Sequence, residues 1–478
     1  MSTLSSVTRA GPATAAPAPA ASPDAAAPAD ERTRRLLSDP VLPTLLRLAL
    51  PNVGEAGARI TFIACDAVFV GWLGTDALAG VALVFPLFLI MQMISAGGLG
   101  AGVASAVARA LGAGQPDAAS RVAGQGLLLA VGIGLAIAVV MLLAGPWLYA
   151  LMGADGDALA QAVVYSNIVF GGGIAVWLMN VAANAVRGTG NMVVPAGAIV
   201  IGEAVHLLLS PALILGWGPL PQLGVTGAAI GVLGAYVTGA VLLLGYLIGG
   251  RSLLKLTRAH LGLRRAQLWE ILRVGIFAAL NVLQFQLAVI IMTVYAGRYG
   301  EAVLAGFGAA LRLELLQIPL IFAFGSAIVT MVATNVGAGR RDRVHRTAWT
   351  GAAIATVIGL GFAALALVRP DAWLGLFSHD PAVLGAGRDY LRIVGATLPL
   401  AAPAIAIFFA ALGTGRIAAP FAVGLVRLAI VAVGGAIAVH LGGDDPLLLY
   451  LVAAGAVVVY APGILLVTRR ALSPHPAG

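Results

Sequence analysis

The sequence contains very little cysteine and lysine. Of its 478 residues, one is cysteine, Cys65, and one is lysine, Lys255. A single cysteine excludes an internal disulfide and a cysteine-based metal site. The phosphate-binding loop of an ATPase ends in Gly-Lys-Ser/Thr, and Lys255 stands in RSLLKLTR, so that motif is absent. H-E-x-x-H metal motifs and G-x-S-x-G nucleophile elbows are absent as well. We therefore expect no enzyme, no bound metal and no cofactor other than a coupling ion.

Charged residues are also scarce. They make up 10% of the chain, whereas 60% of the residues are hydrophobic and the mean hydropathy is +0.98. A soluble domain of ordinary composition has about 25% charged residues. Apolar segments of about twenty residues, each able to cross about 30 Å of hydrocarbon, recur from residue 46 to residue 468. We count twelve of them, so the sequence predicts a multi-pass protein of the lipid bilayer.

The apolar segments are continuous. They lack the alternation over about ten residues that is typical of a membrane barrel. Continuous apolar runs predict helices, because a helix satisfies its own backbone groups in lipid. The 62 glycines agree with this, since small residues let helices approach closely in a bilayer. We expect an all-α membrane protein.

The N-terminal stretch differs from the rest of the chain. Residues 1–30 are rich in alanine and proline and hold almost no bulky apolar side chains. They include no apolar stretch of the signal-peptide type, and their composition is typical of a disordered segment. We expect a disordered cytoplasmic tail over residues 1–40.

Basic residues gather in every second gap between the apolar segments. The basic gaps hold Arg109 and Arg121, Arg187, the five from Arg251 to Arg265, the four from Arg340 to Arg346, and Arg416. The alternate gaps are acidic or neutral apart from Arg298. By the positive-inside rule, the basic gaps and both termini face the cytoplasm of a plasma (inner) membrane. This topology accounts for the net charge of +8 without a nucleic-acid partner.

The chain contains an internal repeat. A shift of 226 aligns residues 46–80 with 272–306, and a shift of 225 aligns 107–123 with 332–348. The matches keep their order through six successive elements, loops included. Each unit has an even number of helices, so both units enter from the same side and are related by an axis along the membrane normal.

The repeat predicts the organisation of the chain. We expect an N-terminal lobe at 41–248 with helices 1–6, a cytoplasmic linker at 249–270, a C-terminal lobe at 271–468 with helices 7–12, and a cytoplasmic tail at 469–478. Two such lobes that rock about a central cleft are typical of alternating-access carriers. A rigid scaffold or a channel formed by duplication is the alternative. A carrier coupled to an ion gradient needs an ionisable group inside the membrane.

Three charged residues share one face of the first apolar segment. Glu55, Arg59 and Asp66 fall within about 40° of one another around a helix. Exposing one charge to lipid costs about 2.5–3.5 kcal/mol, so this face must meet protein or water. Glu55 and Arg59, at i and i+4, are expected to pair. Asp66 is left without a local partner and is a candidate to bind H⁺ or to supply one Na⁺ ligand. A structural polar link between helices is the alternative.

The fifth segment also holds an acid and a histidine. Glu203 and His206 are three residues apart, on roughly one face. Histidine titrates nearest to neutral pH, so these side chains are expected to form a proton-binding pair. A hydrogen-bonded packing role for His206 is the alternative.

The remaining polar residues of the segments are candidates to line the cleft. They are Asn180, Asn184, Asn281, Gln284, Gln286 and Glu314. For the amides, packing hydrogen bonds are an equal alternative. Arg427 is expected to be a structural ion-pair partner. The acids of the lobes outnumber the bases by one, which favours a cationic or zwitterionic cargo.

Several motifs, taken in order, resemble the multidrug and toxic compound extrusion (MATE) family. They are LALPN followed by CDAVFVGWLGTDALAGVAL, the GAG loops at 112–114 and 337–339, RGTGN before Pro195, SPALILGWGPLPQLGVTGAAIG, and GTGR before Pro420. The resemblance covers roughly residues 40–470. It implies twelve transmembrane helices in two pseudo-symmetric six-helix lobes. It also implies expulsion of mainly cationic amphiphilic drugs in exchange for H⁺ or Na⁺.

The resemblance further implies roles for single residues. Asp66 matches the family's cation-binding acid in helix 1, and Pro51 matches a proline at which that helix can bend. Where many bacterial members have Asn-x-x-x-Asp in helix 5, this chain has His206 and Ser210. Gln286 stands near the position of an acid in helix 7 of another branch. Losing the helix 5 acid weakens an oxygen cage for Na⁺, so H⁺ is the expected coupling ion.

The sequence thus predicts a monomeric antiporter that exports small drug-like compounds in exchange for H⁺. Its candidate cation- or proton-binding residues are Asp66, His206, Glu203, Glu55 and Ser210. Na⁺ coupling within the same family is one alternative. A second is a lipid-linked precursor flippase or polysaccharide exporter, in which several arginines are expected in the cleft. A non-transporting scaffold is the third, and it leaves the charges of helix 1 unexplained.

Overall fold

The computed structural model describes residues 30–262 and 264–473, and within these ranges every regular element is helical. The first half contains α1 (Glu31–Ser38), α2 (Val41–Gly71), α3 (Thr75–Met93), α4 (Ala101–Gly112), α5 (Pro116–Leu151), α6 (Gly156–Gly171), α7 (Gly173–Gly188), α8 (Val193–Leu215) and α9 (Val225–Ile248). The second half contains α10 (Arg265–Gly297), α11 (Glu301–Gly337), α12 (Arg341–Val368), α13 (Pro370–Leu374), α14 (Pro381–Ile393), α15 (Leu398–Thr414), α16 (Ala418–Ala429), α17 (Gly435–Leu441) and α18 (Leu447–Leu472). The π-helical stretches Ile94–Gly100 and Ile430–Gly434 join α3 to α4 and α16 to α17.

These helices supply the expected membrane crossings. Within the described ranges, ten helical runs are long and apolar enough to cross a membrane, and α6 with α7, bent by 44°, makes an eleventh. α2 is 31 residues long, which is about 46 Å of helix. Its four charged residues, Arg47, Glu55, Arg59 and Asp66, are spread along the helix. With α2 included, the helices match the twelve segments expected from the sequence.

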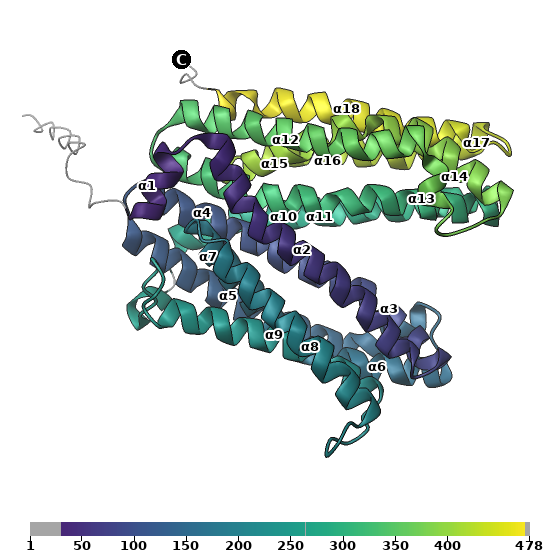
Figure 1. The fold of residues 1–478 in the computed structure, drawn as a ribbon, viewed down its shortest axis with the longest axis horizontal. Helices are drawn as coiled ribbons and strands as arrows, with labels where there is room; N and C mark the ends of the chain where they lie inside the picture. Colours follow the sequence, from purple (N-terminus) through teal and green to yellow (C-terminus); the bar gives the residue numbers. More distant parts are fainter. Residues whose placement is uncertain (1–29, 263, 474–478) are drawn as a thin grey trace, which may run out of the picture.

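The helices form two bundles that meet at one end of the molecule and diverge toward the other (Figure 1). The N-terminal bundle contains α2 to α9, and the C-terminal bundle contains α10 to α18. α1 and the C-terminal end of α18 both lie at the end where the bundles meet. This end is called the closed end below.

Hydrogen bonds between the bundles follow the sequence repeat. Ser105 Oγ donates to the carbonyl of Leu412 (2.7 Å), and Thr330 Oγ1 donates to the carbonyl of Arg187 (3.1 Å). The two donors are 225 residues apart, and so are the two acceptors. Each bond is therefore the counterpart of the other under the repeat, as expected if an axis between the bundles relates them.

α1 corrects the expectation of a disordered tail over residues 1–40. It is a regular helix in which Leu36 is buried. The Leu36 carbonyl accepts hydrogen bonds from Asn335 Nδ2 (3.3 Å) and Arg343 Nη2 (3.0 Å) of the second half. The Ala/Pro-rich composition ends at residue 30, and the sequence of α1 is that of a short amphipathic helix. Residues 1–29 lie outside the described ranges.

The connection between the bundles is shorter than expected. α10 begins at Arg265, within the stretch 249–270 that was expected to be a linker. The connecting chain lies on α5, where Gln125 Nε2 donates to the carbonyl of Gly262 (2.9 Å). At the other terminus α18 continues to Leu472, beyond the expected end of the lobe at 468.

α2 packs on both bundles. Leu45 and Leu48 belong to the buried apolar core formed mainly by the C-terminal bundle, whereas Phe62 and Val70 belong to that of the N-terminal bundle. Pro51 lies between these two pairs, within a helix that is continuous from Val41 to Gly71. Because proline has no N–H, it removes one hydrogen bond of the helix at this point.

Candidate functional site

Asp66 of α2 and His206 of α8 face each other in the N-terminal bundle. His206 Nε2 lies 3.3 Å from Asp66 Oδ1, and the two side chains are 0% and 6% exposed. The expected pair of His206 with Glu203 does not form, because the carboxylate of Glu203 points to Arg59 instead. The acid for the histidine comes from a different helix, at a distance of 140 residues along the chain.

The Asp66–His206 pair lies in apolar surroundings. The Phe62 ring is 4.3 Å from the imidazole ring, and the Phe69 ring is 6.3 Å from it. Ser210, one turn further along α8, is fully buried, and its hydroxyl has no hydrogen-bond partner among the described residues. Such surroundings disfavour a net charge. Neither Asp66 Oδ1 nor either ring nitrogen of His206 has a hydrogen-bond partner among the described residues.

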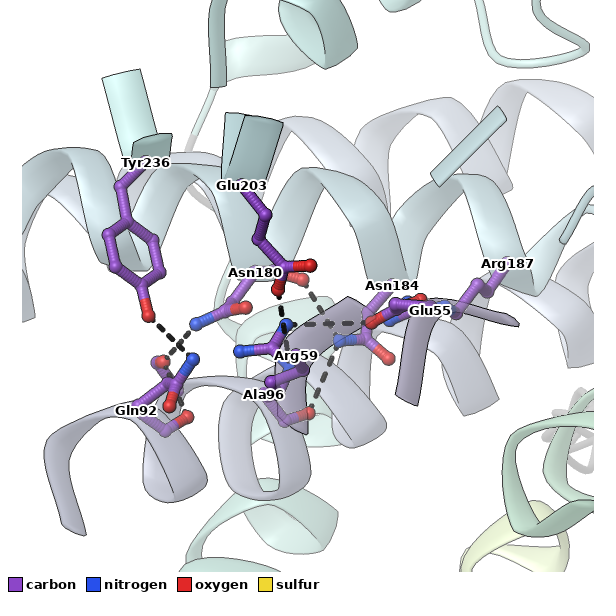
Figure 2. A network of polar contacts seen from close by, with 10 residues as sticks. Glu55, Arg59, Gln92, Ala96, Asn180, Asn184, Arg187, Glu203 and Tyr236 are labelled. Atoms are coloured by element: carbon purple, nitrogen blue, oxygen red, sulfur yellow. Dashed lines mark hydrogen bonds and ion pairs between the residues drawn. The ribbon is translucent and has the colours of Figure 1, made fainter. Parts of the chain in front are cut away.

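Four more charged residues, from α2, α7 and α8, form a chain of ion pairs (Figure 2). Arg187 Nη2 lies 2.5 Å from Glu55 Oε2, and Glu55 Oε1 lies 3.5 Å from Arg59 Nη2. Arg59 Nε in turn lies 3.9 Å from Glu203 Oε1. The expected pair of Glu55 with Arg59 is thus confirmed. The ion-pair chain thus contains two acids and two bases.

Two asparagines of α7 lie beside these charges (Figure 2). Asn180 Nδ2 donates to Ser95 Oγ (2.7 Å), and Asn184 Nδ2 donates to the carbonyls of Ala96 (3.2 Å) and Asn180 (2.9 Å). Ser95 and Ala96 belong to the π-helical stretch between α3 and α4. Such stretches interrupt the regular hydrogen bonding of a helix and are frequent at functional sites. Within this stretch the Ala96 carbonyl accepts a hydrogen bond from Asn184.

A cavity of about 330 Å³ lies between the bundles. Its polar lining consists of Asn52, Glu55, Arg59, Gln92, Asn180, Asn184, Arg187 and Ser326. Of the predicted residues, Glu55, Asn180 and Asn184 therefore line it. Asp66 and His206 do not, because they lie in the interface between α2 and α8, away from its surface.

The two predicted glutamines of α10 do not line this cavity. Gln284 is buried within the C-terminal bundle, and its Nε2 donates to Asn281 Oδ1 (2.6 Å). It packs on Gly424 of α16, where an added Cβ would lie 1.9 Å from Gln284 Nε2. Gln286 is partly exposed on the same helix. For Gln284 the packing alternative fits the structure better than a place in the cleft.

Glu314 lines a separate cavity of about 110 Å³ within the C-terminal bundle. Arg427 lines the same cavity but is not the ion-pair partner expected from the sequence. Its guanidinium lies between two aromatic rings, 5.3 Å from Phe285 and 5.2 Å from Tyr460. Cation–π contacts of this kind hold an arginine without an acid. Glu314 does not line the central cavity.

Sequence reasoning missed two residues of the site. Arg187 was counted among the cytoplasmic charges, although it follows Asn180 and Asn184 at the i, i+4, i+7 spacing of one helix face. That spacing was the available signal. Tyr236 of α9 accepts a hydrogen bond from Gln92 Nε2 (2.6 Å) beside Arg59. A lone tyrosine in an apolar helix gives no such signal.

Comparison with known proteins agrees with this architecture. The family model described as MatE matches residues 60–212 and 278–437, one stretch in each half of the chain. The chain belongs to the MatE family. As a MatE protein it is a multi-pass membrane transporter and not an enzyme. The resemblance found in its motifs and the expected all-helical fold are both confirmed.

Several known MatE relatives cover most of the chain. A "FAD transporter" of Shewanella oneidensis is 30% identical over 356 residues, which are 73% of this chain and 77% of that protein. A "Probable multidrug resistance protein NorM" of Thermotoga maritima is 25% identical over 352 residues, 73% of this chain and 75% of that protein. A solved MOP superfamily transporter from Pyrococcus furiosus has a TM-score of 0.85 at 25% identity, over 93% of this chain and 99% of that chain. That transporter is described as having a binding pocket of reversed polarity, which suggests a different function for it.

Proposed function

We propose that this MatE protein is a secondary active antiporter that exports amphiphilic organic compounds in exchange for H⁺ by alternating access. The observation that carries the proposal is the contact of Asp66 with His206 at 3.3 Å, in apolar surroundings between α2 and α8. An acid and an imidazole shielded from water can hold one proton, release it, or take up a second. They are therefore suited to bind the coupling ion.

Proton binding by this pair would be coupled to the cavity through α2. With one shared proton the pair is neutral, whereas losing or gaining a proton leaves a net charge in apolar surroundings, which costs free energy. The packing of α2 on α8 therefore depends on proton occupancy. Arg59, two turns earlier on α2, lines the cavity and contacts Glu203 of α8. A shift of α2 on proton binding would thus change the shape of the cavity. Proton binding at Asp66 and His206 and cargo binding in the cavity would then be coupled.

The charge distribution supports an orientation in the plasma (inner) membrane with both termini cytoplasmic. Basic residues from the gaps assigned to the cytoplasm lie at the closed end. Arg109 Nη1 donates to the carbonyl of Gly413 (3.2 Å) across the bundles, and Arg340 Nη1 donates to the carbonyl of Leu37 in α1 (2.9 Å). In this orientation the molecule is closed to the cytoplasm and open to the outside.

Pro51 is suited to act as the hinge of the transition. It lies where α2 passes from the core of one bundle to the core of the other. Because the helix lacks one hydrogen bond there, bending at this point costs less than elsewhere in α2. The bundles could then separate at the closed end while each half of α2 keeps its own packing.

H⁺ is favoured over Na⁺ because of the groups around Asp66. Sodium and similar hard cations prefer a cage of oxygen ligands, whereas the carboxylate of Asp66 lies 3.3 Å from an imidazole nitrogen. The cargo is less constrained, since the names of the relatives include both FAD transport and multidrug resistance. The preference for cations that the sequence predicted loses its basis, because Arg187 joins Arg59 in the lining of the cavity, where Glu55 is the one acid.

Dye efflux from proteoliposomes tests the coupling. We expect a pH gradient to drive efflux in the parent protein and a Na⁺ gradient alone to leave it at the background rate. Asp66→Asn and His206→Gln should lower the rate at least about tenfold, since a positioned proton-transfer group contributes factors of 100 or more. Asp76→Asn, which changes an exposed acid at the start of α3, is the matched control. Variants that export at the parental rate, or headgroup translocation without proton movement, would contradict the proposal.

A further inference from the structure

We infer that the central cavity binds the anionic head group of an amphiphilic organic acid, a carboxylate, sulfonate or phosphate, through Arg59 with Arg187 beside it. The inference rests on the proposed function, because it takes the central cavity to be the cargo-binding site of a transporter. It does not depend on which ion drives transport.

The charged lining of the cavity is basic overall. It consists of one acid, Glu55, and two bases, Arg59 and Arg187. Glu203, the fourth member of the ion-pair chain, lies on the far side of Arg59 and lines a separate small pocket. A ligand in the cavity therefore meets one more positive than negative group at close range.

Glu55, the one acid that lines the cavity, already contacts two arginines. Glu55 Oε2 lies 2.5 Å from the guanidinium of Arg187, and Oε1 faces that of Arg59 at 3.5 Å. A cationic ligand would have to displace one of these arginines to reach the carboxylate. Arg187 is 11% exposed and Glu55 is 12% exposed, so neither can turn far toward a ligand without leaving its partner.

Arg59, in contrast, has N–H donors that form no hydrogen bond with either acid. Its distances to Glu55 (3.5 Å) and Glu203 (3.9 Å) are both longer than an N–H···O hydrogen bond of about 2.7–3.2 Å. It is also the most exposed of the four charged side chains, at 28%. A planar guanidinium offers five N–H donors in a fork that matches two oxygens of a carboxylate or phosphate. An oxyanion can thus bind Arg59 without breaking an existing hydrogen bond to either acid.

The rest of the lining fits the body of an amphiphile. Its apolar part includes Ile60, Ile63, Ile318, Phe322 and Phe409. The nitrogens of Asn180 and Asn184 are used in hydrogen bonds within the N-terminal bundle. Their oxygens are therefore left as acceptors for hydroxyl or N–H groups of a ligand. A volume of about 330 Å³ lies within the usual range of small-molecule sites, about 300–1,000 Å³.

The inference is tested by equilibrium binding of two dyes to the full-length protein in nanodiscs, without any ion gradient. Fluorescein and rhodamine 123 share a xanthene body, but the first is anionic and the second cationic. We expect fluorescein to bind more tightly. Arg59→Gln should raise its Kd at least about tenfold, because charge-assisted hydrogen bonds to the oxyanion are lost. Arg47→Gln, at an exposed arginine of α2 beside Asp39, is the control and should leave the Kd unchanged.

Arg59→Lys provides a variant that keeps the charge if Arg59→Gln does not fold. It loses the two-pronged geometry and should weaken fluorescein binding while rhodamine 123 binding stays the same. Tighter binding of rhodamine 123 by the parent would overturn the inference, and so would an unchanged fluorescein Kd in both Arg59 variants. Because no gradient is used, these outcomes are independent of whether H⁺ drives transport. Conversely, if Asp66→Asn exports dye at the parental rate, the proposed coupling is contradicted, but the inference that Arg59 binds an oxyanion is not.

Discussion

Gly112 and Gly337 lie against each other's bundle at the closed end. A Cβ on Gly112 would lie 2.0 Å from the Thr334 carbonyl oxygen, and a Cβ on Gly337 would lie 2.0 Å from the Arg109 carbonyl oxygen. Positions 112 and 337 are 225 residues apart, as are positions 109 and 334. The two contacts are counterparts under the repeat, and both require a residue without a side chain.

Replacing one of these glycines should open the closed end. Gly337→Ala places a methyl group where the backbone of α4 lies, and overpacking of this kind costs about 1–3 kcal/mol. A cysteine at the fully buried Thr330, in a Cys65→Ser background, reports opening through its rate of thiol labelling. We expect that rate to rise about tenfold, because 1.4 kcal/mol corresponds to a factor of ten.

Gly308→Ala is the control for this substitution on the same helix. An added Cβ at Gly308 meets nothing within 4 Å, so the labelling rate should equal that of the parent. If Gly337→Ala labels no faster than Gly308→Ala, the close approach of the bundles at this point does not hold the end closed.

α1 should stabilise the closed end as well. Leu36 of α1 is 4% exposed and contacts both bundles. Its Cδ1 would lie 2.8 Å from a Cβ added to Gly190 of the N-terminal bundle. Its carbonyl accepts hydrogen bonds from Asn335 and Arg343 of the C-terminal bundle. Leu36→Ala removes buried apolar contacts worth about 2–5 kcal/mol. We expect faster labelling of the cysteine at position 330. Arg32→Ala, an exposed change on the same helix, should have no effect, and equal rates for both variants would argue against this role.

The ion-pair chain should make a large contribution to stability. Glu55→Ala leaves the guanidinium groups of Arg59 and Arg187 without their shared acid. Removing one partner of a buried pair costs about 3–5 kcal/mol, so the temperature of thermal unfolding in detergent should fall clearly. Glu31→Ala breaks an exposed pair with Arg35, which is worth about 0–1 kcal/mol. Similar losses for the two variants would show that the Glu55 pairs are no more valuable than surface pairs.

Pro51→Ala should slow transport without weakening cargo binding. Alanine restores the missing hydrogen bond of α2 and so stiffens the helix between the two cores. We expect the efflux rate to fall several-fold while the Kd of a bound dye stays the same. The comparison of single-turnover efflux with equilibrium binding separates the two effects. Pro86→Ala in α3 is the control for a proline substitution inside another helix. A parental efflux rate in Pro51→Ala would remove Pro51 from the mechanism.

Much of the architecture was determined by local features of the sequence. Continuous apolar runs of membrane-spanning length predict helices because backbone groups must be satisfied within each segment. The repeat predicted two matched halves, and it also describes the contacts between them at Ser105, Thr330 and the two glycines. The pairing of Glu55 with Arg59 was also predictable from local sequence, since both residues lie on one helix four positions apart.

Only the tertiary structure decided which of these helices face each other. His206 was assigned to Glu203 because the two are neighbours in sequence, but its acid is Asp66 of α2. Arg187 was expected in a cytoplasmic loop, but it lies in α7, lines the cavity and forms an ion pair with Glu55. The physical reason is that the rotation of each helix is set by packing in all three dimensions, whereas the sequence displays only the order of residues around one helix at a time.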